Sequence, residues 1–132
     1  MNNRLKLISN PHQSSRKKVL CVCSIGYLRS PTAAIVLANE LGFNTRSCGV
    51  DLDHALIPVD EVLLAWADEI VCFELSHVLA LDELLEKHKI AQKIINLNIP
   101  DDYDYMDAEL IAAIKLNYIS HETAQVMPVW SE

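Results

Sequence analysis

The most constraining feature of this sequence is a short, continuously apolar segment that runs directly into a loop and a helix. Lys18–Cys23 (KVLCVC) does not alternate apolar and polar residues, which is typical of a strand buried on both faces of a sheet. A helix is predicted to follow, with Ser30 as its N-cap, Pro31 as its first residue and Gly42 ending it. A buried strand that leads into a helix indicates a crossover connection within a parallel sheet.

The same succession of strand and helix recurs along the rest of the chain. Three further strands are predicted, at Asn44–Val50, Glu69–Glu74 and Lys93–Ile99. Helices are predicted at Val59–Ala67 and Leu75–His88, and a last helix runs from the capping residue Asp107 through Ile119. We therefore predict an α/β fold of three layers, in which helices cover both faces of a four-stranded parallel sheet.

The loops at the carboxyl ends of these strands are the candidate site segments. In doubly wound parallel sheets, ligands bind at that edge, where the strand order reverses. This rule selects the loops 24–30, 51–57, 74–76 and 100–106.

Length and composition indicate one domain spanning residues 1–132. The 132 residues are 51% hydrophobic and 22% charged, which suits a single core. No run of about 18 apolar residues is present, and the amino end lacks the apolar stretch of a secretory signal. We therefore expect a cytoplasmic protein that does not contact a membrane. The basic residues 1–17 are expected to form a flexible leader, and no feature specifies an oligomeric state.

Charge and cysteine placement exclude two classes of function. The formal net charge is -7, and all 18 acidic residues follow Lys18, so general nucleic-acid binding is not expected. The four cysteines form no CxxC pair, so we predict neither a metal site nor a disulfide framework. Cys21, Cys48 and Cys72 lie in apolar segments and are predicted to be packing residues.

Cys23 differs from the other cysteines in the residues on its carboxyl side. Arg29 lies six positions later, Gly26 lies between them, and a predicted helix begins directly behind. A loop of this length can curl so that its backbone N–H groups, the helix amino terminus and the guanidinium surround a tetrahedral oxyanion. The candidate phosphate-binding residues are Ser24, Ile25, Gly26, Tyr27, Leu28 and Arg29.

Such a loop also makes the cysteine reactive. Inward-pointing N–H groups and a guanidinium stabilise a thiolate, which can attack phosphorus in line and form a cysteinyl phosphate. Arg29 and the loop amides would then stabilise the equatorial oxygens of the transition state. Ser30 could donate its hydroxyl to the thiolate and help it to leave in the second step.

The segment C-S-I-G-Y-L-R-S-P resembles the signature loop of the low-molecular-weight protein tyrosine phosphatases, a flavodoxin-like family with Cys-x5-Arg-Ser after its first strand. The likeness extends to SCGV (47–50), DEIVCFELSHVLALDEL (68–84) and the acidic loop IPDDYDY. By position, the resemblance implies that Cys23 is the nucleophile, Arg29 the phosphate-binding arginine and Ser30 the supporting hydroxyl. It implies Asp101 as general acid, with Asp102 as the alternative because the family's next proline is an aspartate here.

The sequence departs from the family pattern inside the loop. Ile25-Gly26 stands where the family usually has Gly-Asn, and Leu28 replaces a second loop cysteine found in many members. Gly26 still permits the curl, because glycine adopts left-handed conformations at little cost. At the mouth of the site, Tyr27 and three further residues are candidate rim residues, namely Tyr103, Tyr105 and His54.

These features predict a metal-free phosphomonoester hydrolase that needs no cofactor. The family suggests protein phosphotyrosine as substrate, and nucleotides or small metabolites remain open. The alternatives are arsenate reduction on the same fold and a phosphate-binding or phosphocarrier domain with little hydrolysis.

Overall fold

The computed structural model describes residues 16–126, and their fold is an α/β sandwich built on one sheet. The strands are β1 (Lys18–Cys23), β2 (Asn44–Gly49), β3 (Glu69–Cys72) and β4 (Lys93–Asn96). They lie in the order β2-β1-β3-β4, and all neighbours are parallel. The predicted four-stranded parallel sheet is thereby confirmed.

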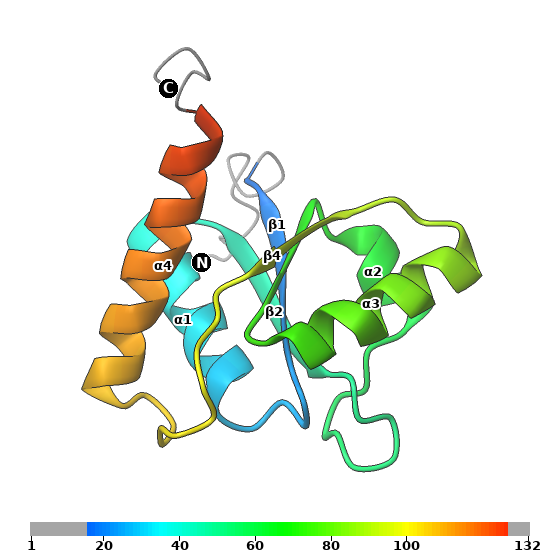
Figure 1. The fold of residues 1–132 in the computed structure, drawn as a ribbon, viewed down its shortest axis with the longest axis horizontal. Helices are drawn as coiled ribbons and strands as arrows, with labels where there is room; N and C mark the ends of the chain where they lie inside the picture. The colour runs from blue at the N-terminus through cyan, green and yellow to red at the C-terminus, as the bar shows by residue number, and fades with distance from the viewer. Residues whose placement is uncertain (1–15, 127–132) are drawn as a thin grey trace, which may run out of the picture.

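Helices cover both faces of this sheet (Figure 1). Helices α1 (Arg29–Leu41) and α4 (Ala108–Val126) lie on one face, and α2 (Glu61–Trp66) and α3 (Leu75–His88) lie on the other. Strand β1 serves both cores, because Val19, Cys21 and Cys23 pack toward α1 and α4 while Leu20 and Val22 pack toward α2 and α3. This double burial explains why its sequence is continuously apolar.

The start of α1 differs from the prediction. The helix begins at Arg29, and its N-cap is Leu28, which makes no side-chain capping bond. Ser30 was predicted as the N-cap, and this is wrong because its hydroxyl lies 3.1 Å from the Cys23 thiol instead. The Ser30 side chain therefore contacts the end of β1 instead of capping the helix.

Several other boundaries also differ from the prediction. Helix α2 begins only after Asp60, whose carboxylate accepts the Leu63 N–H at 2.8 Å and caps the helix. Strand β4 stops at Asn96 because Asn98 has a left-handed φ of 55°, although Ile99 still donates to the Phe73 carbonyl at 2.9 Å. The third strand, β3, likewise ends two residues earlier than predicted.

At its far end, α4 continues past the predicted stop at Ile119 to Val126. The apolar periodicity ends there, but Glu122 lies within 3.9 Å of Lys17 and 3.7 Å of Lys93. Lys17 also lies 3.3 Å from the buried carboxylate of Glu69. This lysine of the predicted leader is therefore fixed to the sheet, whereas residues 1–15 of that leader lie outside the described residues.

The remaining cysteines are packing residues, as predicted. Cys21, Cys48 and Cys72 are buried, and none forms a disulfide. Burial raises the pKa of Cys48 and of Cys72 to about 12, and raises that of Cys21 further. Within residues 16–126, no helix combines the length and apolar character needed to cross a bilayer.

Candidate active site

Cys23 is the last residue of β1, at the point where the chain leaves the centre of the sheet. Strand β1 lies between β2 and β3, so the order of connections reverses here, as expected for a ligand site. The thiol is almost fully buried and accepts the Gly26 N–H at 3.1 Å. The Ser30 hydroxyl oxygen also lies 3.1 Å from the sulfur.

The loop from Cys23 to Arg29, called here the 23–29 loop, is turned by contacts from the β2 side. The carbonyl oxygens of residues 23–25 accept N–H groups of Val50, Asp51 and Leu56 at 2.9, 2.8 and 3.4 Å. In a trans peptide the carbonyl and the next N–H point in opposite directions, so the following N–H groups are directed away from β2. The Gly26 N–H on the sulfur agrees with this, and Gly26 takes a left-handed φ of 82°.

Arg29 is buried and held by three groups from the edge of the sheet. Its Nη1 donates to the Ile99 carbonyl at 2.9 Å, and its Nη2 lies 2.8 Å from the Glu74 carboxylate. Its Nε lies 3.7 Å from Asp101. The hydrogen bond from Arg29 holds the pKa of Glu74 below its usual range. The guanidinium is thus fixed in orientation beside the cysteine.

A pocket of about 150 Å³ lies against these groups, lined by Cys23, Ser24, Ile25, Tyr27, Leu28, Arg29 and Asp101. All but one of these residues belong to the 23–29 loop. The residues predicted from the sequence to bind phosphate therefore lie around one small cavity, with Gly26 contributing its N–H to the sulfur at 3.1 Å. A concave site with converging donors suits a compact anion.

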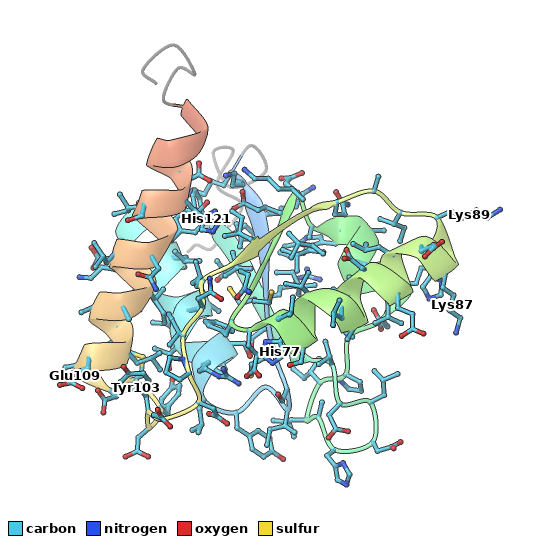
Figure 2. The ribbon with its side chains drawn as sticks, in the orientation of Figure 1. His77, Lys87, Lys89, Tyr103, Glu109 and His121 are labelled. Atoms are coloured by element: carbon cyan, nitrogen blue, oxygen red, sulfur yellow. The ribbon has the colours of Figure 1, made fainter. Side chains whose placement is uncertain are left out.

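The two candidate acids are not equivalent in the structure. Both carboxylates are exposed, but Asp101 lines the pocket, whereas Asp102 lies outside this lining. Of the predicted rim residues, Tyr27 lines the pocket and is half-exposed. The other three lie outside its lining: Tyr103 packs partly against the α1 and α4 core (Figure 2), Tyr105 is half-exposed, and His54 is exposed and bonded to Asp51.

Three residues near the site were not among the sequence candidates. Glu74 and His77 follow β3, and Ser47 lies on β2 with its hydroxyl 2.9 Å from that of Ser30. Of these, Glu74 lies in the loop 74–76, which the sequence selected because it follows the carboxyl end of a predicted strand. Each of the three residues contacts a residue that is distant in the sequence, so motif spacing alone could not identify these contacts.

Thr32 connects the 23–29 loop to the distant loop 100–106. Its hydroxyl donates to the Leu28 carbonyl at 2.7 Å and accepts the Met106 N–H at 3.0 Å. Asp101 therefore lies on a loop attached to the first turn of α1. Among the described residues, no three His, Cys, Asp or Glu side chains are arranged to hold a metal ion.

Gly49 shows how closely β2 packs against the 23–29 loop. A Cβ at this position would lie 2.7 Å from the Ser24 carbonyl oxygen and 2.8 Å from the Ile25 carbonyl carbon. Gly49→Ala should therefore displace the loop, weaken binding of inorganic phosphate by about tenfold or more, and lower the free energy of unfolding by about 1–3 kcal/mol. Calorimetric titration and thermal unfolding measure the two effects.

Gly42→Ala is the matched control for this change. Gly42 has a left-handed φ of 73° at the end of α1, and nothing lies within 4 Å of its missing Cβ. This variant should lose about 1 kcal/mol of stability and keep phosphate binding. Equal phosphate affinities in the two variants would contradict a role for the close packing at Gly49.

Comparison with known proteins identifies the fold. The sequence matches no protein-family model, and no curated protein is significantly similar to it. The tyrosine phosphatase Wzb from Escherichia coli K30, solved in complex with phosphate, matches with a TM-score of 0.63 and 17% identity, covering 85% of this chain and 99% of that one. The Erwinia amylovora tyrosine phosphatase AmsI gives 0.64 and 15%, covering 83% and 93%.

A third similar structure carries a different activity. The YwlE arginine phosphatase from Geobacillus stearothermophilus matches with a TM-score of 0.61 and 18% identity, covering 85% of this chain and 98% of that one. At these identities the comparisons establish a shared fold, the flavodoxin-like arrangement expected from the sequence.

Proposed function

We propose that this chain is a cysteine-dependent phosphomonoester hydrolase that works without a metal ion, through a cysteinyl phosphate on Cys23. The observation that carries the proposal is the setting of the sulfur. It accepts the Gly26 N–H and lies 3.1 Å from the Ser30 hydroxyl, while the buried Arg29 lines the same pocket. These groups can hold a tetrahedral anion in front of the sulfur.

In the first step the Cys23 thiolate attacks phosphorus, and the bond from phosphorus to the ester oxygen breaks. Asp101, which lines the pocket, gives its proton to that oxygen so that a neutral alcohol leaves. Arg29 and the loop N–H groups stabilise the negative charge on the equatorial oxygens in the transition state.

In the second step water attacks the cysteinyl phosphate. The Asp101 carboxylate takes the proton of this water, and the bond from phosphorus to sulfur breaks to give phosphate and thiolate. Ser30 stabilises the departing thiolate, since its hydroxyl lies within hydrogen-bond distance of the sulfur. The sequence of two steps balances without an oxidant, a reductant or a cofactor.

Two alternatives from the sequence are less well supported. Arsenate reduction needs a second thiol to receive the oxidation, but Cys21, Cys48 and Cys72 are buried and their pKa values are raised by burial. A phosphocarrier would keep its cysteinyl phosphate, whereas Arg29 beside the sulfur supports hydrolysis.

A protein phosphotyrosine is our first choice of substrate. The half-exposed ring of Tyr27 at the pocket offers an apolar surface to an aromatic leaving group. The proposed test is hydrolysis of an aryl phosphate in the presence of EDTA, followed by acid quenching and mass spectrometry of the peptide that contains Cys23. Turnover with a phosphorylated Cys23 is the expected result, and an absence of turnover would contradict the proposed function.

The general acid can be identified by two isosteric changes. Asp101→Asn should lower kcat for an ester with a poor leaving group by about 10²–10³-fold, because the leaving oxygen loses its proton donor. It should also remove the decline in rate at alkaline pH that a general acid imposes. Asp102→Asn is the matched control and should stay within about threefold of wild type. If Asp102→Asn instead of Asp101→Asn lowers kcat and removes the alkaline decline, Asp102 is the general acid.

A further inference from the structure

His77 is a fully buried histidine beside the 23–29 loop whose role the proposed chemistry does not explain. It lies in the first turn of α3, next to the carboxyl end of β1 (Figure 2). Its Nδ1 accepts the Phe73 backbone N–H at 3.2 Å, and its Nε2 lies 3.1 Å from the Ser24 hydroxyl oxygen. One imidazole therefore connects β3 to the first residue of the loop.

The Phe73 contact determines which nitrogen carries the proton. A backbone N–H can only donate, so Nδ1 must offer its lone pair, and the neutral ring then carries its hydrogen on Nε2. Burial, assisted by the nearby Arg29, lowers the pKa of His77 to about 4, so the ring is neutral near neutral pH. The Nε2–H group thus donates to Ser24.

Because the Ser24 oxygen accepts the hydrogen bond from His77, the hydroxyl hydrogen of Ser24 must point toward a different acceptor. A serine hydroxyl has one hydrogen to donate, and here one of its lone pairs is already taken. Ser24 lines the pocket together with Cys23 and Arg29. The Glu74 carboxylate is the other acceptor near Nε2, but at 3.7 Å it is too far for a hydrogen bond.

We propose that His77 is a positioning residue that orients Ser24, so that the Ser24 hydroxyl donates to a non-bridging oxygen of the bound phosphate. The proposal rests on the proposed function for the identity of the anion. The Ser24 hydroxyl is thereby added as a side-chain donor to the backbone donors of the loop, and it is oriented by a residue 53 positions away in the sequence.

Two substitutions of His77 distinguish the role of Nδ1 from the role of Nε2. His77→Asn keeps an acceptor at the place of Nδ1, next to Phe73, but removes the donor to Ser24. His77→Gln keeps a donor at the place of Nε2 and removes the acceptor. Calorimetric titration of the full chain with inorganic phosphate measures the effect of each substitution on the pocket. Thermal unfolding measures its effect on the stability of the fold.

The two variants should rank in opposite order in phosphate affinity and in Tm. His77→Asn should weaken phosphate binding by about tenfold, the effect of losing one hydrogen bond to a charged group, and His77→Gln should stay within about threefold. His77→Gln should have the lower Tm, because it leaves the buried Phe73 N–H without an acceptor. A merely structural histidine would give the same order in both readouts, and that result would overturn the proposal.

Ser24→Ala completes the test without disturbing the His77–Phe73 contact. It should weaken phosphate binding by about tenfold with little change in Tm, and the double variant with His77→Asn should bind no more weakly than Ser24→Ala alone. Phosphate binding by Ser24→Ala equal to wild type would overturn the proposal even if His77→Gln does not fold.

The same experiment distinguishes this inference from the function it rests on. Wild-type phosphate binding with the expected order of variants, but no hydrolysis of aryl phosphate, would support His77 and contradict the hydrolase. Hydrolysis that is insensitive to Ser24→Ala and His77→Asn would contradict the role of His77 alone.

Discussion

Replacing Cys23 with serine is expected to lower aryl phosphate hydrolysis by about 10⁴-fold or more, while binding of inorganic phosphate is retained. A serine hydroxyl is a much weaker acid and a much weaker nucleophile than a cysteine thiol. Binding is retained because a serine oxygen can still accept the Gly26 N–H, and because Ile99 and Glu74 rather than the sulfur hold Arg29 in position. Steady-state rates and calorimetric titration with phosphate measure the two effects.

Cys21→Ala is the matched control for the nucleophile. Cys21 lies on the same strand and is fully buried in the core against α1 and α4. Its replacement should lower the free energy of unfolding by about 1 kcal/mol and leave the rate near that of wild type. Hydrolysis that survives in Cys23→Ser would show that another group attacks phosphorus.

The second large effect is expected at Arg29, where Arg29→Lys should lower kcat/KM for an aryl phosphate by about 10³-fold. The guanidinium donates in several directions at once, to Ile99 and Glu74 behind it and toward the pocket in front. An ammonium is a point charge that cannot reproduce this planar set of donors. The charge is conserved, so a large loss would reflect geometry rather than electrostatics alone.

Arg46→Lys is the corresponding control. Arg46 lies on β2 with its guanidinium 4.4 Å from the centre of the Trp66 ring, away from the pocket lining. Its replacement should leave kcat/KM within about twofold of wild type. A similar loss in both variants would indicate a general effect of replacing arginine by lysine and would contradict the proposed role of Arg29.

Most of the fold could be predicted because the sequence patterns are strong and local. The apolar run of Lys18–Cys23 and the repeated succession of strand and helix indicate the parallel sheet, and the sheet is confirmed. Boundaries were missed where a single contact decides them. Ser30 has the ideal residue type for an N-cap, yet its hydroxyl contacts Cys23, and Asn98 ends β4 through a backbone conformation that its neighbours do not signal.

The site could be predicted where its residues lie together in the sequence. The spacing of Cys23 and Arg29 suffices to place both at one loop, and both line the pocket. His77 and Glu74 could not be paired with this loop, because their contacts with it depend on β3 lying beside β1. His54 was selected for its loop position, but it is exposed and bonded to Asp51.

The loop 100–106, which carries Asp101, is attached to the rest of the fold at both of its ends. The loop is held before its first residue by Ile99, which bonds to Phe73 and to Arg29, and at its last residue by Met106 on Thr32. Its few residues therefore have little freedom, and most of the conformational entropy of bringing Asp101 to the pocket is lost during folding rather than in each turnover. Under the proposed function, substrate would therefore meet Asp101 already at the pocket, and selectivity would depend on which substrates can enter rather than on an induced closure of this loop.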